Sequence, residues 1–106
     1  LIGFPGQAAY VASKHGVLGL TKTAAMEYGK QGVLINAICP GTARTAMVTN
    51  VIDESPELEE ELHRLHPIGR VAEPEEIAEA ALWLCSGRAS FVMGSALVVD
   101  GGYTAQ

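Results

Sequence analysis

Tyr10 and Lys14 are the two residues whose types and spacing are best suited to chemistry in this chain. They lie four positions apart in the segment AYVASKHGVLGLTK, which runs from Ala9 to Lys22. On a helix, side chains at positions i and i+4 share one face, with Cβ atoms about 6 Å apart. An ammonium beside a phenol favours the phenolate, so such a pair could move a proton. Taken alone, the spacing is more typical of a half-buried tyrosine and a lysine on an amphipathic helix.

Three further motifs follow this pair along the chain. They are NAICPGTART (Asn36 to Thr45), PIGR (Pro67 to Arg70) and VVDGG (Val98 to Gly102). In this order, and together with YVASKHG, they resemble the C-terminal part of the short-chain dehydrogenase/reductase family over nearly the whole chain. The resemblance implies an α/β fold class, the C-terminal portion of a Rossmann-like doubly wound parallel sheet. It also implies hydride transfer between a nicotinamide dinucleotide and a small alcohol or ketone.

The resemblance assigns roles to the first pair of residues. Tyr10 matches the family's catalytic acid–base, which protonates a carbonyl oxygen or accepts a hydroxyl proton. Lys14 matches the group that favours the phenolate and holds the nicotinamide ribose hydroxyls. Its ammonium has three N–H donors, enough for two ribose oxygens and a water. Tyr10 and Lys14 are therefore expected to be catalytic and also to contact NAD or NADP.

The second motif is expected to contact the same cofactor. Pro40 and Gly41 resemble the family's turn beside the nicotinamide, while Ala43 and Thr45 match positions that usually contact its carboxamide. Thr45 also fits a helix N-cap, and both roles are compatible. Asn36, a polar residue in an apolar run, is expected to make structural hydrogen bonds.

The other two motifs are expected to be architectural. Within them, Arg70 is expected to be an internal ion-pair partner. The family's Gly-rich turn, an Asn and a catalytic Ser all precede the Tyr, so they lie before Leu1. We therefore expect residues 1–106 to be a single fragment, the C-terminal part of a dinucleotide-binding domain, with NAD and NADP not distinguishable.

Hydrophobic spacing and turn residues predict the elements that position these side chains. A helix is expected from Gln7 to about Tyr28, with Gly16 and Gly19 packed closely against another backbone. The remaining elements are a strand at Val33–Ile38, a substrate-binding lid of one or two short helices at 42–66, a helix opened by Glu73 and Pro74, and a strand at Ser95–Val99. The order is helix, strand, lid, helix, strand. In such sheets, ligands bind at the carboxyl ends of the strands.

Composition narrows the range of functions. The net charge of −5 argues against a nucleic-acid or anionic-membrane surface, and no apolar run is long enough to span a membrane. Cys39 and Cys85 are expected to be buried, reduced thiols of a cytoplasmic protein. His63 and His66 lack the accompanying ligands of a known metal site, so no metal is expected.

Two other functions remain open. A non-catalytic truncated module could associate through the long helix without binding nucleotide. A sugar-nucleotide epimerase or dehydratase shares the Tyr/Lys pair, but those relatives continue into a substrate domain, and we expect none here. For the oxidoreductase, the resemblance implies a homo-tetramer or homo-dimer formed through the long helix and the C-terminal strand.

Overall fold

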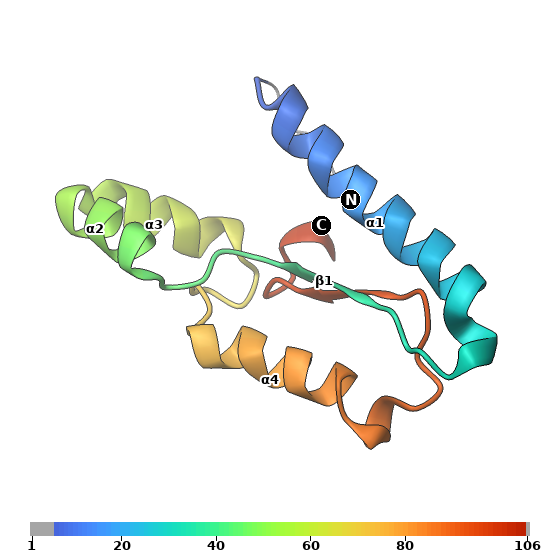
Figure 1. Ribbon diagram of the computed structural model, residues 1–106. Coiled ribbons are helices and arrows are strands. Elements are labelled where there is room, and N and C mark those ends of the chain that lie inside the picture. Colours follow the sequence, from blue (N-terminus) through green and yellow to red (C-terminus); the bar gives the residue numbers. More distant parts are fainter. Residues whose placement is uncertain (1–5, 106) are drawn as a thin grey trace.

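Two parallel strands lie at the centre of the structure, a computed structural model that describes residues 6–105. Helix α1 lies on one side of the strands and α4 on the other, while α2 and α3 project from one end (Figure 1). The elements are α1 (Ala8–Tyr28), β1 (Ala37–Pro40), α2 (Ala46–Glu54), α3 (Pro56–Leu65), α4 (Pro74–Leu84) and β2 (Ala96–Val99). Short 3₁₀ turns follow at Gly29–Gln31, Gly87–Ala89 and Tyr103–Ala105. This order and the parallel pairing confirm the predicted fold class.

Strand β1 does not have the predicted bounds. It pairs with β2 in register from Ala37 beside Ala96 to Pro40 beside Val99, so the strand includes the proline expected to end it. The backbone N–H groups of Ala37 and Gly41 both point toward β2, where they donate to the carbonyls of Ser95 and Val99. Pro40 therefore has its nitrogen on the opposite edge, where the missing donor costs no bond to β2.

The predicted strand residues before β1 instead form an extended segment fixed by a side chain. The Asn36 amide nitrogen donates to the carbonyl of Val92 at 2.9 Å, and its oxygen accepts the Ser95 backbone N–H at 3.0 Å. Asn36 thus joins the chain ahead of β1 to the chain ahead of β2, which confirms its structural role.

Helix α1 matches its predicted length to within one residue. It continues into the first 3₁₀ turn, and the chain then reverses at Gly32, whose φ of 78° is a left-handed conformation suited to glycine. The prediction that Gly16 and Gly19 pack closely against another backbone is wrong for the described part of the chain. A Cβ built at either position has no neighbouring atom within 4 Å there.

The lid segment, residues 42–66, forms two helices. Ser55 separates α2 from α3, and Pro56 occupies the first position of α3. Helix α4 begins as predicted, with Pro74 at its first position. A capping box joins Glu73 to Glu76, whose side chain accepts the Glu73 backbone N–H at 2.9 Å.

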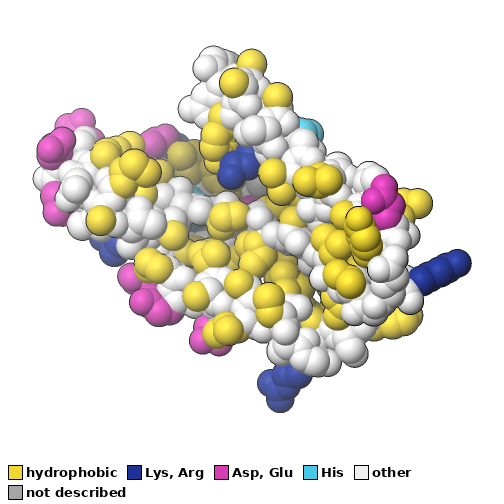
Figure 2. Space-filling model, viewed as in Figure 1, with side chains coloured by type: hydrophobic (Ala, Val, Ile, Leu, Met, Phe, Trp, Pro, Cys, Tyr) yellow, Lys and Arg dark blue, Asp and Glu magenta, His cyan; other side chains and the backbone are white. Residues whose placement is uncertain are grey.

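The core of the described residues is small. Its buried apolar residues are Ala25, Ile52, Val71 and Ala89. Hydrophobic side chains also gather over the middle of the face between α1 and α4 in Figure 2. The prediction of two buried cysteines is wrong, since Cys39 is half-buried and Cys85 is exposed at the end of α4; both are free thiols. Among the described helices, none is apolar over a length that would cross a bilayer.

Candidate active site

Tyr10 and Lys14 lie side by side on the first turns of α1. Alanines at positions 8, 9 and 12 surround the pair, and alanine has the highest helix propensity. The Lys14 Nζ lies 5.2 Å from the centroid of the Tyr10 ring. Both side chains are exposed, Tyr10 at 55%. The phenol and the ammonium are therefore adjacent and accessible to a ligand, as the spacing predicts.

The Lys14 ammonium is available for a ligand as well. Over residues 6–105, the ion pairs involve arginines and one histidine but not this lysine. The Ser13 hydroxyl, which lies between the pair, donates to the Tyr10 backbone carbonyl at 2.7 Å and so faces its own helix. Among the described residues, the Tyr10 hydroxyl and the Lys14 ammonium are thus accessible polar groups that make no hydrogen bond to their own helix.

A second group of predicted residues lies on one loop, Gly41–Thr45, directly after β1. Thr45 is the N-cap of α2, and its hydroxyl oxygen accepts the Val48 backbone N–H at 3.4 Å. This confirms the capping role and leaves the Thr45 hydroxyl hydrogen able to donate elsewhere.

The loop is extended at Ala43, which forms a parallel bridge with Ala72. The Arg44 N–H donates to the Ala72 carbonyl at 2.8 Å, and the Ala72 N–H donates to the Thr42 carbonyl at 2.9 Å. Successive amides of an extended chain point to opposite sides, so the Ala43 N–H points away from Ala72. Ala43 thus presents a backbone donor on the other side of the loop.

Both groups lie toward one end of the sheet. Helix α1 runs back over the strands, so its first turns approach the end from which α2 and α3 project (Figure 1). This is also the end at which β1 leads into the Gly41–Thr45 loop. The structure thus has Tyr10 and Lys14 on the first turns of α1, and it has Pro40, Gly41, Ala43 and Thr45 at the end of β1 and in the loop that follows it.

Beneath the loop lies a cavity of about 270 Å³ that the sequence did not indicate as a site. Thr42, His66, Arg70, Glu76 and Asp100 contribute to its lining. Arg70 and Asp100 come from the two motifs assigned an architectural role, Thr42 and His66 from the two ends of the lid segment, and Glu76 from the first turn of α4. The sequence feature that could have indicated this cavity was His66, directly before the PIGR motif. From the sequence, that histidine is considered only with His63 as a possible metal ligand, and no metal is expected.

Charged pairs stabilise this region. The Arg70 guanidinium donates to Glu76 at 2.6 Å, which confirms the predicted ion-pair role. This hydrogen bond and the Glu73 backbone N–H lower the pKa of Glu76 to about 2. Burial raises the pKa of Asp100, but donors from Thr104 and Gly102 outweigh it and leave that pKa below its ordinary value.

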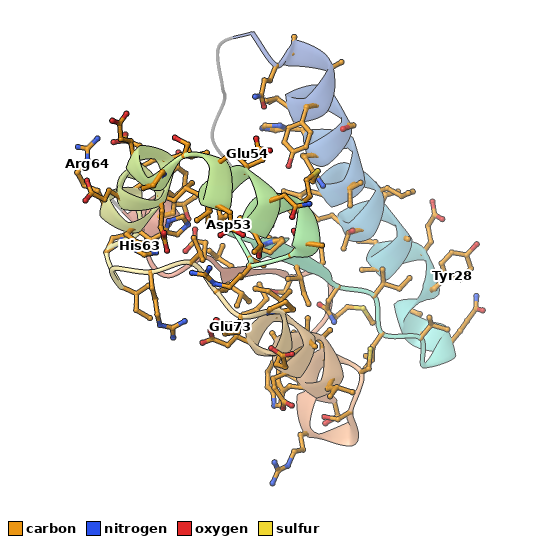
Figure 3. The ribbon with its side chains drawn as sticks, turned by 90° about the vertical axis from the view of Figure 1, so that its left-hand side faces the viewer. Tyr28, Asp53, Glu54, His63, Arg64 and Glu73 are labelled. Carbon is orange, nitrogen blue, oxygen red and sulfur yellow. The ribbon has the colours of Figure 1, made fainter. Side chains whose placement is uncertain are left out.

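The lid segment also carries ion pairs. Arg44 lies 3.6 Å from Glu59 of α3 and 3.7 Å from Glu73 at the start of α4. His63 approaches the same Glu59 at 3.8 Å, whereas Arg64 projects outward from α3 in Figure 3. Within residues 6–105, no three His, Cys, Asp or Glu side chains are grouped as a metal site would require.

Comparison with known proteins identifies the family. The model of a family described as enoyl-(acyl carrier protein) reductase matches residues 1–104. A solved short-chain dehydrogenase family protein from Francisella tularensis superposes over 100% of this chain and 47% of its own, with a TM-score of 0.91 and 33% identity. The chain belongs to the short-chain dehydrogenase/reductase family, as its motifs predict.

Individual relatives are enzymes that act on small molecules. The A-factor type gamma-butyrolactone 1'-reductase (1S-forming) of Streptomyces virginiae is 61% identical over 104 residues, which are 98% of this chain and 40% of that protein. The structure of 4-hydroxyisoleucine dehydrogenase complexed with NADH is 39% identical, with a TM-score of 0.91 over 99% of this chain and 43% of its own. The chain thus spans about two fifths of the length of these relatives.

Proposed function

We propose that this chain is the C-terminal part of an NAD(P)-dependent oxidoreductase that transfers a hydride between a nicotinamide cofactor and a small alcohol or ketone. The observation that carries the proposal is the exposed pair on α1, with the Lys14 Nζ 5.2 Å from the Tyr10 ring. The names of the relatives support the same reaction class, since one is a reductase and another a dehydrogenase complexed with NADH.

The residues present fit a nicotinamide dinucleotide. Lys14 offers three N–H donors suited to ribose hydroxyls. The Ala43 N–H and the Thr45 hydroxyl are donors suited to the carboxamide oxygen, and both belong to the loop after β1. Pro40 and Gly41 form the turn that brings this loop over the end of the strand. Together with Tyr10, these five residues are our candidates for cofactor contact, and they are compatible with NAD and NADP alike.

In the proposed mechanism, a bound nicotinamide would supply the hydride donor or acceptor, and residues of this chain would handle the proton. Tyr10 would donate its hydroxyl proton to a carbonyl oxygen during reduction, or accept a proton from the alcohol during oxidation. Lys14 would stabilise the resulting phenolate through its charge, while holding the ribose. The lid segment, residues 42–66, would cover the substrate and exclude water from the transfer.

Substitution of Tyr10 by Phe in the full-length protein tests the function. Turnover should fall by about 10²–10⁴-fold because a general acid–base is lost, while affinity for NADH or NADPH should change little. Tyr28→Phe is the control, because it makes the same change at the other end of α1 (Figure 3). It should leave turnover and cofactor affinity unchanged. Undiminished turnover in Tyr10→Phe would contradict the mechanism. Absence of NADH and NADPH binding in the unmodified protein would favour the non-catalytic module.

We also propose that the full-length protein is a homo-tetramer or homo-dimer and that it resides in the cytoplasm. Large apolar side chains are exposed on α1 and β2, including Leu20 at 70%, Met26 at 86% and Val98 at 51%. Burying such side chains in a subunit interface is favourable. The two free cysteines fit a reducing compartment.

A further inference from the structure

His66 lies where the two ends of the lid segment meet. It directly follows α3, and its Nε2 accepts the backbone N–H of Thr42, the first residue of the segment, at 3.5 Å. Two backbone hydrogen bonds, which join Ala72 to Thr42 and to Arg44, also hold the start of the lid segment in place. The imidazole thus links the end of the lid to the loop that carries Ala43 and Thr45.

The imidazole ring is held from several sides. The side chain is only 5% exposed, and the Tyr103 ring lies against it with 5.5 Å between centroids. The Nδ1 atom lies 2.7 Å from the Leu62 carbonyl, which can only accept, so Nδ1 carries the hydrogen. Neutral His66 therefore has its Nε2 lone pair facing the Thr42 N–H, as that hydrogen bond requires.

The hydrogen bond between His66 and Thr42 affects the candidate site because Ala43 directly follows Thr42. The Ala43 N–H points out of the loop on the side away from Ala72. A shift of the Thr42 amide would rotate the next peptide unit and move that donor. We propose that His66 is a positioning residue, which fixes the Ala43 amide and the Thr45 hydroxyl against the nicotinamide through its Nε2 bond to Thr42. This inference rests on the proposed function.

Two substitutions separate the contacts of the ring. In His66→Gln, the carboxamide oxygen reaches about as far as Nε2 and can still accept from Thr42. In His66→Asn, the shorter amide reproduces the Nδ1 donor to Leu62 and loses the bond to Thr42. We expect His66→Asn to raise KM for NADH or NADPH about tenfold, with a smaller change in kcat, and His66→Gln to resemble the unmodified enzyme.

Hydride stereochemistry gives a readout that a purely structural role would not change. The test uses a reduced cofactor that carries deuterium on one face of the nicotinamide C4. The unmodified enzyme and His66→Gln should transfer hydride from a single face. His66→Asn should transfer hydride measurably from both faces, because the nicotinamide carboxamide is held less firmly. Full face selectivity and an unchanged KM in His66→Asn would overturn the proposal.

A measurement on the unmodified protein does not depend on how the variants fold. The imidazole ¹⁵N shifts of His66 should show a hydrogen on Nδ1 and none on Nε2 at neutral pH. The Thr42 amide should be protected from hydrogen exchange. A hydrogen on Nε2 would contradict the inference while leaving cofactor binding intact. A failure of the proposed function would appear instead as absence of NADH and NADPH binding.

Discussion

Gly41 and Asp100 lie so close that no side chain fits between their backbones. A Cβ atom built on Gly41 would be 2.8 Å from the Asp100 Cα and 3.0 Å from its Cβ. The two residues directly follow β1 and β2, so the loops at the carboxyl ends of both strands pack backbone against backbone. The position of the loop that carries Ala43 and Thr45 therefore depends on the absence of a side chain at Gly41.

Gly41→Ala should disturb this contact. A backbone shift of the required size costs about 1–3 kcal/mol, and we expect the free energy of unfolding to fall by that amount. Denaturant unfolding of the full-length protein measures it. Gly87→Ala is the control, since a Cβ there has no neighbour within 4 Å among the described residues. Equal stability of the two variants would show that the Gly41 contact tolerates a methyl group.

Lys14→Ala should weaken cofactor binding and turnover together. Hydrogen bonds from a charged donor contribute about 1.5–3 kcal/mol, so the Kd for NADH or NADPH should rise about 10–100-fold. Fluorescence titration gives the Kd, and initial rates give kcat. Lys22→Ala, two turns further along α1, should change neither. A Lys14→Ala enzyme with unmodified affinity and an unmodified pH–rate profile would exclude the double role of this residue.

Asp100→Asn should destabilise the turn after β2, most strongly at neutral pH. The carboxylate accepts the Gly102 N–H, the Thr104 N–H and the Thr104 hydroxyl at 2.6–3.0 Å, and an amide nitrogen cannot accept. We expect a loss of about 1.5–3 kcal/mol at pH 7, measured by urea unfolding.

The pH dependence of that loss follows from the lowered pKa of Asp100. The folded protein binds this proton less tightly than the unfolded chain, so the carboxylate stabilises the fold above about pH 4 and this contribution is lost in acid. The difference between Asp100→Asn and the unmodified protein should therefore narrow as the pH falls below 4. A difference that stays constant with pH would assign the effect to packing alone.

The sequence was most informative where local patterns determine the structure. Pro74 before acidic residues predicted the start of α4, and the four-residue spacing of Tyr10 and Lys14 predicted their contact. These features depend on neighbours along one helix, which a sequence displays directly. Whether the six candidate residues contact a cofactor stays a prediction.

The features that were wrong or missed depend on contacts between distant segments. The bounds of β1 follow from its pairing with β2, which tolerates Pro40 because that nitrogen faces the other edge. The role of His66 depends on Thr42, which lies 24 positions earlier in the chain. Neither relationship leaves a periodic trace in the sequence, so neither could be read from it.

The orientation of Pro40 has a consequence for the opposite edge of β1. Its ring nitrogen bears no hydrogen, so a strand that pairs with that edge will lack the last backbone hydrogen bond from β1. Two parallel strands joined by one bond fewer at their carboxyl ends can splay apart there. The proline thus ends the hydrogen bonding along that edge at the carboxyl end of β1, where Gly41 begins the loop of the candidate site.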